Sequence, residues 1–478
     1  MDQDSDRLVR PTALPEKEHR VKRIPWIIAA LAAALYCSFS VTQWNGFISP
    51  SWDLGIFTQL ANQYAHFNAP IVDIKGPGYN LLGDHFHPIL ILLGPVFRLF
   101  PSGLTLLILQ NLLFAWSSVP ITRLASQKFG AGWGAALGVS YALSWGLLEA
   151  IAAQFHEIAF AVPLLAFGLV HWIEGRKRAY IEIGLLAFVK EDLGLTVAAF
   201  GFVMLLSTWG QAAPRRSFAS LKKSLTSRQA RNGWLMICWG FFWFVASIWI
   251  ILPLLNPGGV WDYTGRLSET SFFAPAEKYV TLALLLASAG IIGIRSPLML
   301  LMIPTLLWRF AGNVPYYWGW EWHYSAILMP IAAVSLIDGL SSSSSLKIPP
   351  RTLGALGISL SLLTSLAMAW TGPVGSYVRG NYYVLDQRAG EGAVNAVRDN
   401  ARVVSDFRML AYLVPGNTLY WEGTVGDATV DTAVISPGHS AHSQHPEEWA
   451  SKKFGGTWKI VYDQSGFTVL ERIDLLTQ

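Results

Sequence analysis

The chain has 478 residues, of which 52% are hydrophobic and only 14% are charged, and it contains 21 Trp. This composition is far too apolar for an ordinary soluble domain and indicates an integral membrane protein. The net charge of +4 is not evidence for nucleic-acid binding, because Lys and Arg gather in loops where membrane topology explains them. Cys37 and Cys238 both lie in apolar runs, so no disulfide framework or zinc ribbon is expected.

Residues 1–23 are polar and lack the apolar core of a signal peptide, so they are expected to form a cytoplasmic N-terminal tail. Beyond them, apolar runs long enough to cross about 30 Å of hydrocarbon recur, which predicts an all-α polytopic transmembrane bundle over residues 24–372. Two of about eleven predicted segments, 179–190 and 193–208, are each too short to cross comfortably. The other segments are 25–45, 103–124, 131–149, 158–174, 234–255, 276–293, 297–312, 323–340 and 351–371.

Basic residues sort the loops onto two sides. Arg20, Lys22 and Arg23 precede the first segment, and the basic stretches 174–179 and 214–231 follow later ones. The alternate loops contain few Lys or Arg, so the positive-inside rule places them outside the cytoplasm, together with the C-terminal tail. These outer loops are 46–102, 150–157, 256–275 and 313–322.

The first outer loop, residues 46–102, contains two helix-like stretches that are too short to cross the membrane. In residues 54–67 the apolar positions repeat at helical spacing, and residues 87–101 are apolar with a proline near each end. Both stretches are predicted to form amphipathic interfacial helices that lie parallel to the membrane.

The C-terminal residues 373–478 differ in character from the bundle. A helix-like piece at 391–400 is followed by short β-prone runs that turn signals separate, which predicts a small extracytoplasmic α/β domain. The stretch H-S-A-H-S-Q-H at 439–445 has regularly spaced histidines, but it lies in a polar loop and is interpreted as a solvated segment.

Ionisable residues gather on the predicted outer side of the bundle, where they are costly and therefore informative. Each has a simpler alternative: Asp53 suits a helix N-cap, Lys190 suits a structural ion pair with a neighbouring acid, and the aromatics near Glu321 suit an interfacial belt. These alternatives do not explain why acids, histidines and bases lie together on one face, whereas a water-filled cavity does. The ionisable residues concerned are Asp53, Asp84, His85, His87, His156, Glu157, Lys190, Glu191, Asp192, Arg266, Arg309, Glu321 and His323, and the polar Gln154 lies beside them in the sequence.

A divalent metal ion is a further hypothesis for the same residues. His85, His87 and His156 offer nitrogen ligands, and Asp53, Asp84 or Glu157 offer oxygen ligands, a combination that suits such an ion. The set of candidate ligands is Asp53, Asp84, His85 and His156. The D-H-x-H pattern is short and common, so the metal site is kept as an alternative and no cofactor is assigned.

Four stretches, "DLGIFTQ", "NLLGDHFHPIL", "FHEIAFAVP" and "VKEDLGLT", resemble a bacterial family of predicted membrane proteins of unknown function. The order of elements, with an acid opening the first outer loop and an extracytoplasmic C-terminal domain, resembles the GT-C superfamily of polyprenyl-phosphate-sugar-dependent glycosyltransferases. The resemblance implies that Asp53 is the general base on the acceptor, that the sugar inverts and that a lipid phosphate leaves. Many such enzymes carry a second acid at this point, where this chain has Trp52.

The chemistry of glycosyl transfer assigns the remaining roles. An inverting reaction needs a carboxylate to take the proton of the incoming oxygen, and the departing phosphate needs cations. Catalytic candidates are Asp53, Asp84 and Glu157; donor-phosphate candidates are Lys190, Arg309, Arg266 and His85; and sugar or acceptor candidates are His87, His156, Trp320, Glu321 and His323.

The sequence thus favours a membrane glycosyltransferase (EC 2.4) in the bacterial cell membrane. Its expected partners are a polyprenyl-phosphate-linked sugar donor, membrane lipids and a glycan, lipid or protein acceptor of the cell envelope, with no nucleic acid. A transporter or flippase is the alternative, since intramembrane ionisable residues also mark transport paths. A third interpretation is a scaffold whose outer domain binds glycan. No internal repeat is visible and the ionisable residues lie at one face, which favours the enzyme.

Overall fold

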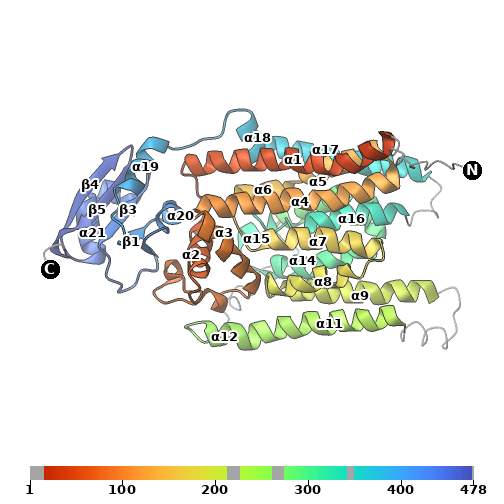
Figure 1. Ribbon diagram of the computed structural model, residues 1–478, viewed down its shortest axis with the longest axis horizontal. Helices are drawn as coiled ribbons and strands as arrows, with labels where there is room; N and C mark the ends of the chain where they lie inside the picture. The colour runs from red at the N-terminus through yellow and green to blue at the C-terminus, as the bar shows by residue number, and fades with distance from the viewer. Residues whose placement is uncertain (1–15, 213–226, 261–273, 342–348, 476–478) are drawn as a thin grey trace, which may run out of the picture.

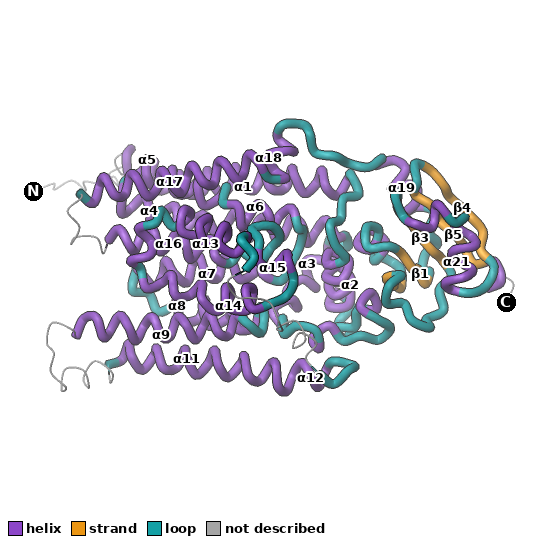
Figure 2. The backbone as a smooth tube through the Cα atoms, turned by 180° about the vertical axis from the view of Figure 1, so that it is seen from behind, coloured by secondary structure: helices purple, strands orange, loops and turns teal. Residues whose placement is uncertain are grey.

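A computed structural model describes residues 16–212, 227–260, 274–341 and 349–475 of the chain. Long helices lie side by side in one bundle, and a small sheet with its own helices lies at one end of it (Figure 1). The same arrangement is seen from behind, where the strands are confined to that end (Figure 2). The protein is therefore mostly helical with a small C-terminal sheet, as the sequence predicts.

Among the residues that the structure describes, five helical stretches are long and apolar enough to cross a membrane, at 22–45, 103–129, 131–152, 228–255 and 351–371. Five shorter apolar helices accompany them, so the expected count of about eleven crossings stays a prediction. The helices of the bundle are α1 (Glu16–Asn45), α4 (Gly103–Phe129), α5 (Ala131–Ala142), α6 (Trp145–Ala152), α7 (Ile158–Ile173), α8 (Arg178–Gly184), α9 (Leu193–Ala212), α11 (Arg228–Ala246), α12 (Leu252–Leu255), α13 (Glu277–Ser288), α14 (Ile303–Ala311), α15 (Pro315–Trp318), α16 (Leu328–Ser341), α17 (Pro350–Thr371) and α18 (Pro373–Val378).

Interruptions in the helices place polar residues at the sheet end of the bundle. The segment expected at 179–190 is a short α8 followed by a 3₁₀ turn, Leu185–Phe188, and the chain leaves helical geometry before Lys190. The residues Lys190 to Asp192 therefore form a turn that precedes α9. A π-helical turn, Ser247–Ile251, joins α11 to α12, and such turns are frequent at functional sites.

Glycines let α9 and α11 approach each other closely. A Cβ atom added to Gly201 on α9 would lie 2.5 Å from the carbonyl oxygen of Gly233 on α11. Small residues at helix contacts are typical of packing in membranes, where no hydrophobic effect drives two helices together. The backbones of α9 and α11 therefore approach closely at Gly201 and Gly233.

The first outer loop is helical at both predicted stretches, and its first helix is more buried than an interfacial helix would be. α2 (Asp53–Ala65) runs across the direction of the long helices (Figure 1), and all its residues from Leu54 to Ala61 are buried. The second stretch is a 3₁₀ turn (Pro88–Leu92) followed by α3 (Leu93–Leu99). α2 is covered because α3 packs against one side of it and the C-terminal region packs against another.

The C-terminal region is a mixed sheet with the strand order β2-β1-β3-β5-β4. Strands β1, β2 and β3 are parallel, and β5 pairs antiparallel with both β3 and β4. The helix expected at 391–400 starts earlier, because Asp386 caps it by accepting from the backbone N–H groups of Arg388 and Ala389. The elements are α19 (Gln387–Asn395), β1 (Arg402–Ser405), α20 (Leu410–Leu413), β2 (Thr418–Trp421), β3 (Thr432–Ile435), α21 (Pro446–Phe454), β4 (Trp458–Gln464) and β5 (Phe467–Arg472).

Side chains join the sheet to the bundle. The buried Gln59 of α2 donates to the carbonyl oxygen of Leu419 on β2, and its own oxygen accepts from the N–H of Ile74. Tyr412 of α20 stacks on Trp44 of α1 and donates to its carbonyl oxygen at 2.8 Å. These buried contacts fix the sheet against the end of the bundle, next to the polar turns.

Candidate active site

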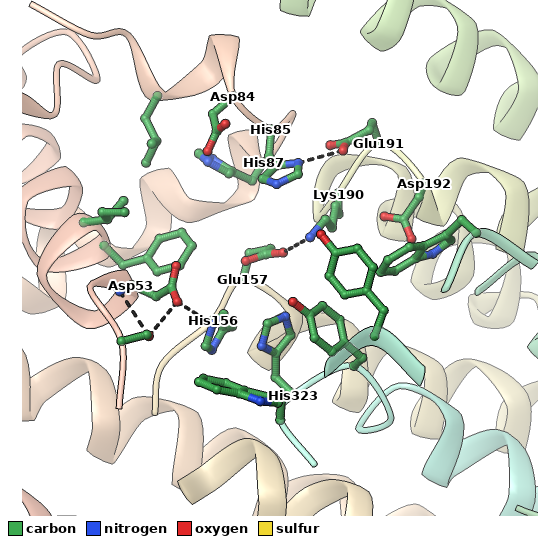
Figure 3. A pocket seen from close by; sticks show the side chains of 18 of the residues that line it. Asp53, Asp84, His85, His87, His156, Glu157, Lys190, Glu191, Asp192 and His323 are labelled. Atoms are coloured by element: carbon green, nitrogen blue, oxygen red, sulfur yellow. Dashed lines mark hydrogen bonds and ion pairs between the residues drawn. The ribbon is translucent and has the colours of Figure 1, made fainter. Parts of the chain in front are cut away.

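A cavity of about 580 Å³ lies at the end of the bundle that faces the sheet. Its walls come from the start of α2, the loop that follows α2, the turns before α7 and α9, and the segment that connects α14 to α16. Polar side chains from all these elements point into one space (Figure 3). The polar lining residues are Ser51, Asp53, Lys75, Asp84, His85, His87, His156, Glu157, Lys190, Glu191, Asp192, Tyr316, Tyr317, His323 and Tyr324.

Asp53 is the first residue of α2, and its side chain does not cap that helix. Ser51 donates its hydroxyl to Oδ2 of Asp53 at 2.6 Å, and Nε2 of His156 lies 3.5 Å from the same oxygen. Burial opposes ionisation of Asp53, but His156 and Ser51 outweigh it and lower the pKa of the carboxyl below its usual value. The helix N-terminus also favours a negative charge at this position. Asp53 is therefore an ionised carboxylate at neutral pH.

The other two candidate acids are engaged in ion pairs. Oδ2 of Asp84 lies 3.1 Å from Nζ of Lys75, and Oε1 of Glu157 lies 2.8 Å from Nζ of Lys190. Burial opposes ionisation of Glu157, yet the ammonium of Lys190 holds its pKa well below the usual range. The side chain of Asp53 is 31% exposed, against 12% for Asp84 and 3% for Glu157. Asp53 is thus the most accessible acid of the three.

The histidines of the cavity differ in their partners. Nδ1 of His85 lies 2.7 Å from Oε1 of Glu191, whose second oxygen accepts from the N–H of Phe86 at 3.0 Å. The rings of His156 and His323 stack with centroids 3.6 Å apart. Burial lowers the pKa of His87 to about 4, so this ring is neutral at neutral pH.

Four buried polar atoms of the cavity are left without a hydrogen bond within the part of the chain that the structure describes. They are Nδ1 of His87, Nδ1 of His323, Oδ1 of Asp192 and Nε1 of Trp308. An unsatisfied buried polar group costs free energy, so atoms of this kind mark places where a ligand or water supplies the missing partner. Burial, followed by the nearby Glu191, raises the pKa of Asp192 to about 6 against the opposing effect of Lys190.

The structure separates Arg309 from the other predicted residues. Its buried guanidinium donates to the carbonyl oxygens of Tyr317 and Gly319 at 2.8 Å and to Oγ of Ser325 at 3.0 Å. Arg309 does not line the cavity, because these bonds direct it into the backbone of the segment that carries His323. Its place indicates a structural role. Arg266 lies outside the described residues.

Trp320 and Glu321 do not line this cavity either. They line a neighbouring cavity of about 730 Å³. Among the described residues, Trp322 alone lines both cavities. The residues that the structure brings together from the predicted set are Asp53, Asp84, His85, His87, His156, Glu157, Lys190, Glu191, Asp192 and His323.

Sequence reasoning missed Lys75. Its ammonium pairs with Asp84 and lies 5.1 Å from the ring centroid of Trp52 and 5.5 Å from that of Tyr79. A signal was present, because only Lys75 and Arg98 are basic in the whole loop 46–102. The tyrosines of the 316–324 segment were also missed, since an aromatic belt explains such residues equally well.

The candidate ligands for a divalent metal do not converge. Asp53 contacts His156, Asp84 contacts Lys75, and His85 contacts Glu191. Within the described residues there is no group of three or more His, Cys, Asp or Glu side chains placed to hold a metal ion. We therefore derive no step through a metal.

Residues 45–469 match the sequence family described as "Predicted membrane protein (DUF2079)", and the chain belongs to this family. No curated protein matches the sequence. The predicted resemblance to an uncharacterised membrane family is confirmed by this match.

The protein ArnT, whose structure is solved, shares the fold. ArnT from Cupriavidus metallidurans in the apo state aligns with a TM-score of 0.52 and 11% identity, over 94% of this chain and 98% of that chain. The same protein bound to undecaprenyl phosphate gives the same TM-score over 93% and 97% of the two chains. The Archaeoglobus fulgidus oligosaccharyltransferase aligns with a TM-score of 0.44 and 12% identity, over 86% and 69%. The chain has a GT-C-like fold, as its motif order predicts.

Proposed function

We propose that this protein is a membrane glycosyltransferase that moves a sugar from a polyprenyl-phosphate donor to an acceptor hydroxyl, with Asp53 as the general base. One observation carries the proposal: an ionised, accessible carboxylate shares a cavity with paired lysines and histidines at the end of a GT-C-like bundle. The fold raises the expectation of this chemistry, and the arrangement of the cavity supplies the groups that it needs.

Asp53 has the properties that an inverting transfer requires. The acceptor oxygen attacks the anomeric carbon while its proton passes to Oδ2 or Oδ1 of Asp53, and the bond between that carbon and the phosphate oxygen breaks on the opposite face. Ser51 and His156 hold the carboxylate in place. His156 in turn is positioned by its stacking on His323.

Cations on another wall of the cavity suit the leaving phosphate. Figure 3 places Lys190 on the far side of Glu157 from Asp53. The ammonium of Lys190 donates one hydrogen bond to Glu157 at 2.8 Å, and its other N–H groups can meet a phosphate oxygen. His85 and Lys75 also line the cavity and supply further donors. Charge-assisted hydrogen bonds in a site that excludes water stabilise a developing negative charge strongly.

The cavity also meets a wall that suits a lipid tail. Phe244 and Ile248 line it from α11 and the π-helical turn, while Trp249 and Ile250 of the same turn are 77% and 62% exposed. An exposed apolar helix face in a membrane protein meets lipid. A donor that lives in the bilayer could therefore enter sideways past this helix. The structure of ArnT bound to undecaprenyl phosphate shows that a protein of this fold binds such a lipid.

The proposed setting follows from charge and chemistry. The cavity and the sheet lie on the side that the positive-inside rule places outside the cytoplasm, so the reaction is assigned to the outer face of a bacterial plasma membrane. The acceptor is assigned to the glycans, lipids or proteins of the cell envelope. A transporter would use ionisable residues along a path through the membrane, whereas the cavity described here lies at one end of the bundle.

The test is a donor screen with Asp53→Asn as its central variant. Purified protein in nanodiscs is incubated with a panel of polyprenyl-phosphate sugars and an envelope extract, and glycan products are measured by mass. Wild-type protein and the control Asp399→Asn, at an exposed position of the sheet region, are expected to transfer sugar. Asp53→Asn should reduce transfer by at least a thousandfold with unchanged thermal unfolding. Transfer at the wild-type rate by Asp53→Asn, or solute transport without transfer by the wild type, would contradict the proposal.

A further inference from the structure

The second cavity lies beside the first at the ends of α1, α6 and α17, where the chain passes into α18 and the linker to the sheet. Its volume is about 730 Å³, and Trp322 lies in the walls of both cavities. Trp322 has a positive φ of 67°, which is rare for a bulky residue and indicates that the surrounding structure holds it there. The two cavities therefore meet at Trp322.

The charge of the second cavity is of one sign. Glu149 on α6 and Glu321 both line it, and none of the described residues that line it is Lys, Arg or His. A Cβ atom on Gly372 would lie 3.0 Å from Oε1 of Glu149, so a glycine at the end of α17 leaves room for this carboxylate. The nearby Arg379 donates to the carbonyl oxygen of Trp370 and lies over its ring, 4.9 Å from the centroid.

Gln43 supplies an independent sign of a missing partner. Its side chain is 1% exposed, and its Nε2 donates to the carbonyl oxygen of Ala152 at 3.0 Å and to the hydroxyl of Tyr382 at 3.1 Å. Its Oε1 accepts no hydrogen bond from any residue that the structure describes. Gln43 lines the second cavity, so its unsatisfied Oε1 marks a place in the cavity wall where a hydrogen-bond donor is missing.

We infer that the second cavity binds the acceptor of the proposed transfer through a protonated primary amine on that acceptor. Two carboxylates without a basic counterpart attract a cation, and the faces of Trp320, Trp322 and Tyr382 add the aromatic surface that ammonium groups prefer. The amine anchors the acceptor beyond Trp322, and a hydroxyl on the same molecule reaches past that side chain to Asp53. The identification of the ligand as an acceptor rests on the proposed function, whereas the preference for an amine rests on the cavity alone.

Two kinds of molecule carry this chemistry at a membrane surface. One is a glycan with an unacetylated amino sugar, and the other is a lipid with an aminated head group. The experiment has one arm for each and measures binding without a donor, so it does not depend on turnover. In the first arm, titration calorimetry compares chitobiose whose two amines are free with its N,N′-diacetyl form. In the second, native mass spectrometry compares retention of phosphatidylethanolamine with that of phosphatidylglycerol.

Wild-type protein should bind the amine form at least tenfold more tightly than its neutral or anionic counterpart in one arm. Glu321→Gln, at an exposed position where misfolding is not expected, should reduce that preference at least fivefold, and Glu149→Gln should do the same. The control Glu391→Gln, on α19 outside the cavity, should keep the full preference. Equal binding of amine and non-amine probes in both arms, or a preference that survives both cavity substitutions, would overturn the inference. If amine binding holds but no donor yields transfer, only the proposed function fails.

Discussion

Breaking the ion pair between Lys190 and Glu157 should separate the contribution of the pair to stability from the contribution of Lys190 to donor binding. The two side chains are 14% and 3% exposed, and removing one partner of a buried pair typically costs about 3 to 5 kcal/mol. Lys190→Met keeps the length of the side chain and leaves Glu157 as a buried carboxylate, so a loss of about 3 kcal/mol is expected. Glu157→Gln should cost less, about 1 to 2 kcal/mol, because Glu191 and Asp192 still face the ammonium.

The double variant Lys190→Met/Glu157→Gln leaves neither charge behind and should recover about 2 kcal/mol relative to the sum of the single variants. Unfolding of the purified protein in detergent, followed by Trp fluorescence in increasing denaturant, measures this coupling. Sugar transfer should be lost in Lys190→Met and should stay lost in the double variant, because the donor phosphate then lacks its cation. Additive stability losses would show that the pair does not form. Wild-type transfer by the double variant would show that Lys190 does not bind the donor.

Three further predictions follow from the geometry. Asp192, whose pKa is raised to about 6, should lose its negative charge as the pH falls below 6, which should lower the donor KM of the wild type but not that of Asp192→Asn. Because the pKa of Asp53 is lowered, kcat should stay level down to about pH 5. Initial rates measure both constants. Gly201→Ala should lower the stability of the bundle by about 1 to 3 kcal/mol because its Cβ meets the backbone of α11, whereas Gly132→Ala, with open space around it, should be neutral or mildly stabilising in the same unfolding assay. Chelation by EDTA should leave the transfer rate unchanged, since the candidate ligands are divided among separate contacts; loss of activity that Mn²⁺ restores would contradict this.

Much of the helical framework could be predicted from the sequence because length and apolar composition determine it directly. The predicted stretches 54–67 and 351–371 correspond to α2 and α17, and the β-prone part of the tail beyond residue 400 contains β1 to β5. The segment at 179–190 was harder, since hydropathy does not show where a short helix ends. The polar turn that contains Lys190 forms where this helix ends, so the position of the turn could not be predicted either.

Which charges pair could not be predicted, because pairing depends on contacts between residues far apart in the chain. His85 and Glu191 are 106 positions apart, and Lys190 and Glu157 are 33 positions apart. The charge pattern indicates on which side of the membrane a residue lies but gives no partner. Arg309 illustrates the difference: its placement near an outer loop suggested phosphate binding, whereas its hydrogen bonds go to the backbone around Tyr317.

The contacts also bear on which acid takes the proton, a question that the sequence left among three residues. A general base must accept a proton and therefore give up its negative charge during the reaction. If Glu157 did so, Lys190 would lose its closest counterion in a buried position, and if Asp84 did so, Lys75 would lose the carboxylate 3.1 Å away. Asp53 contacts a hydroxyl and an imidazole instead. Both can turn from donor to acceptor or change tautomer, so protonation of Asp53 leaves no charge stranded. Asp53 is therefore the acid whose protonation costs the least free energy, and it is also the most accessible of the three.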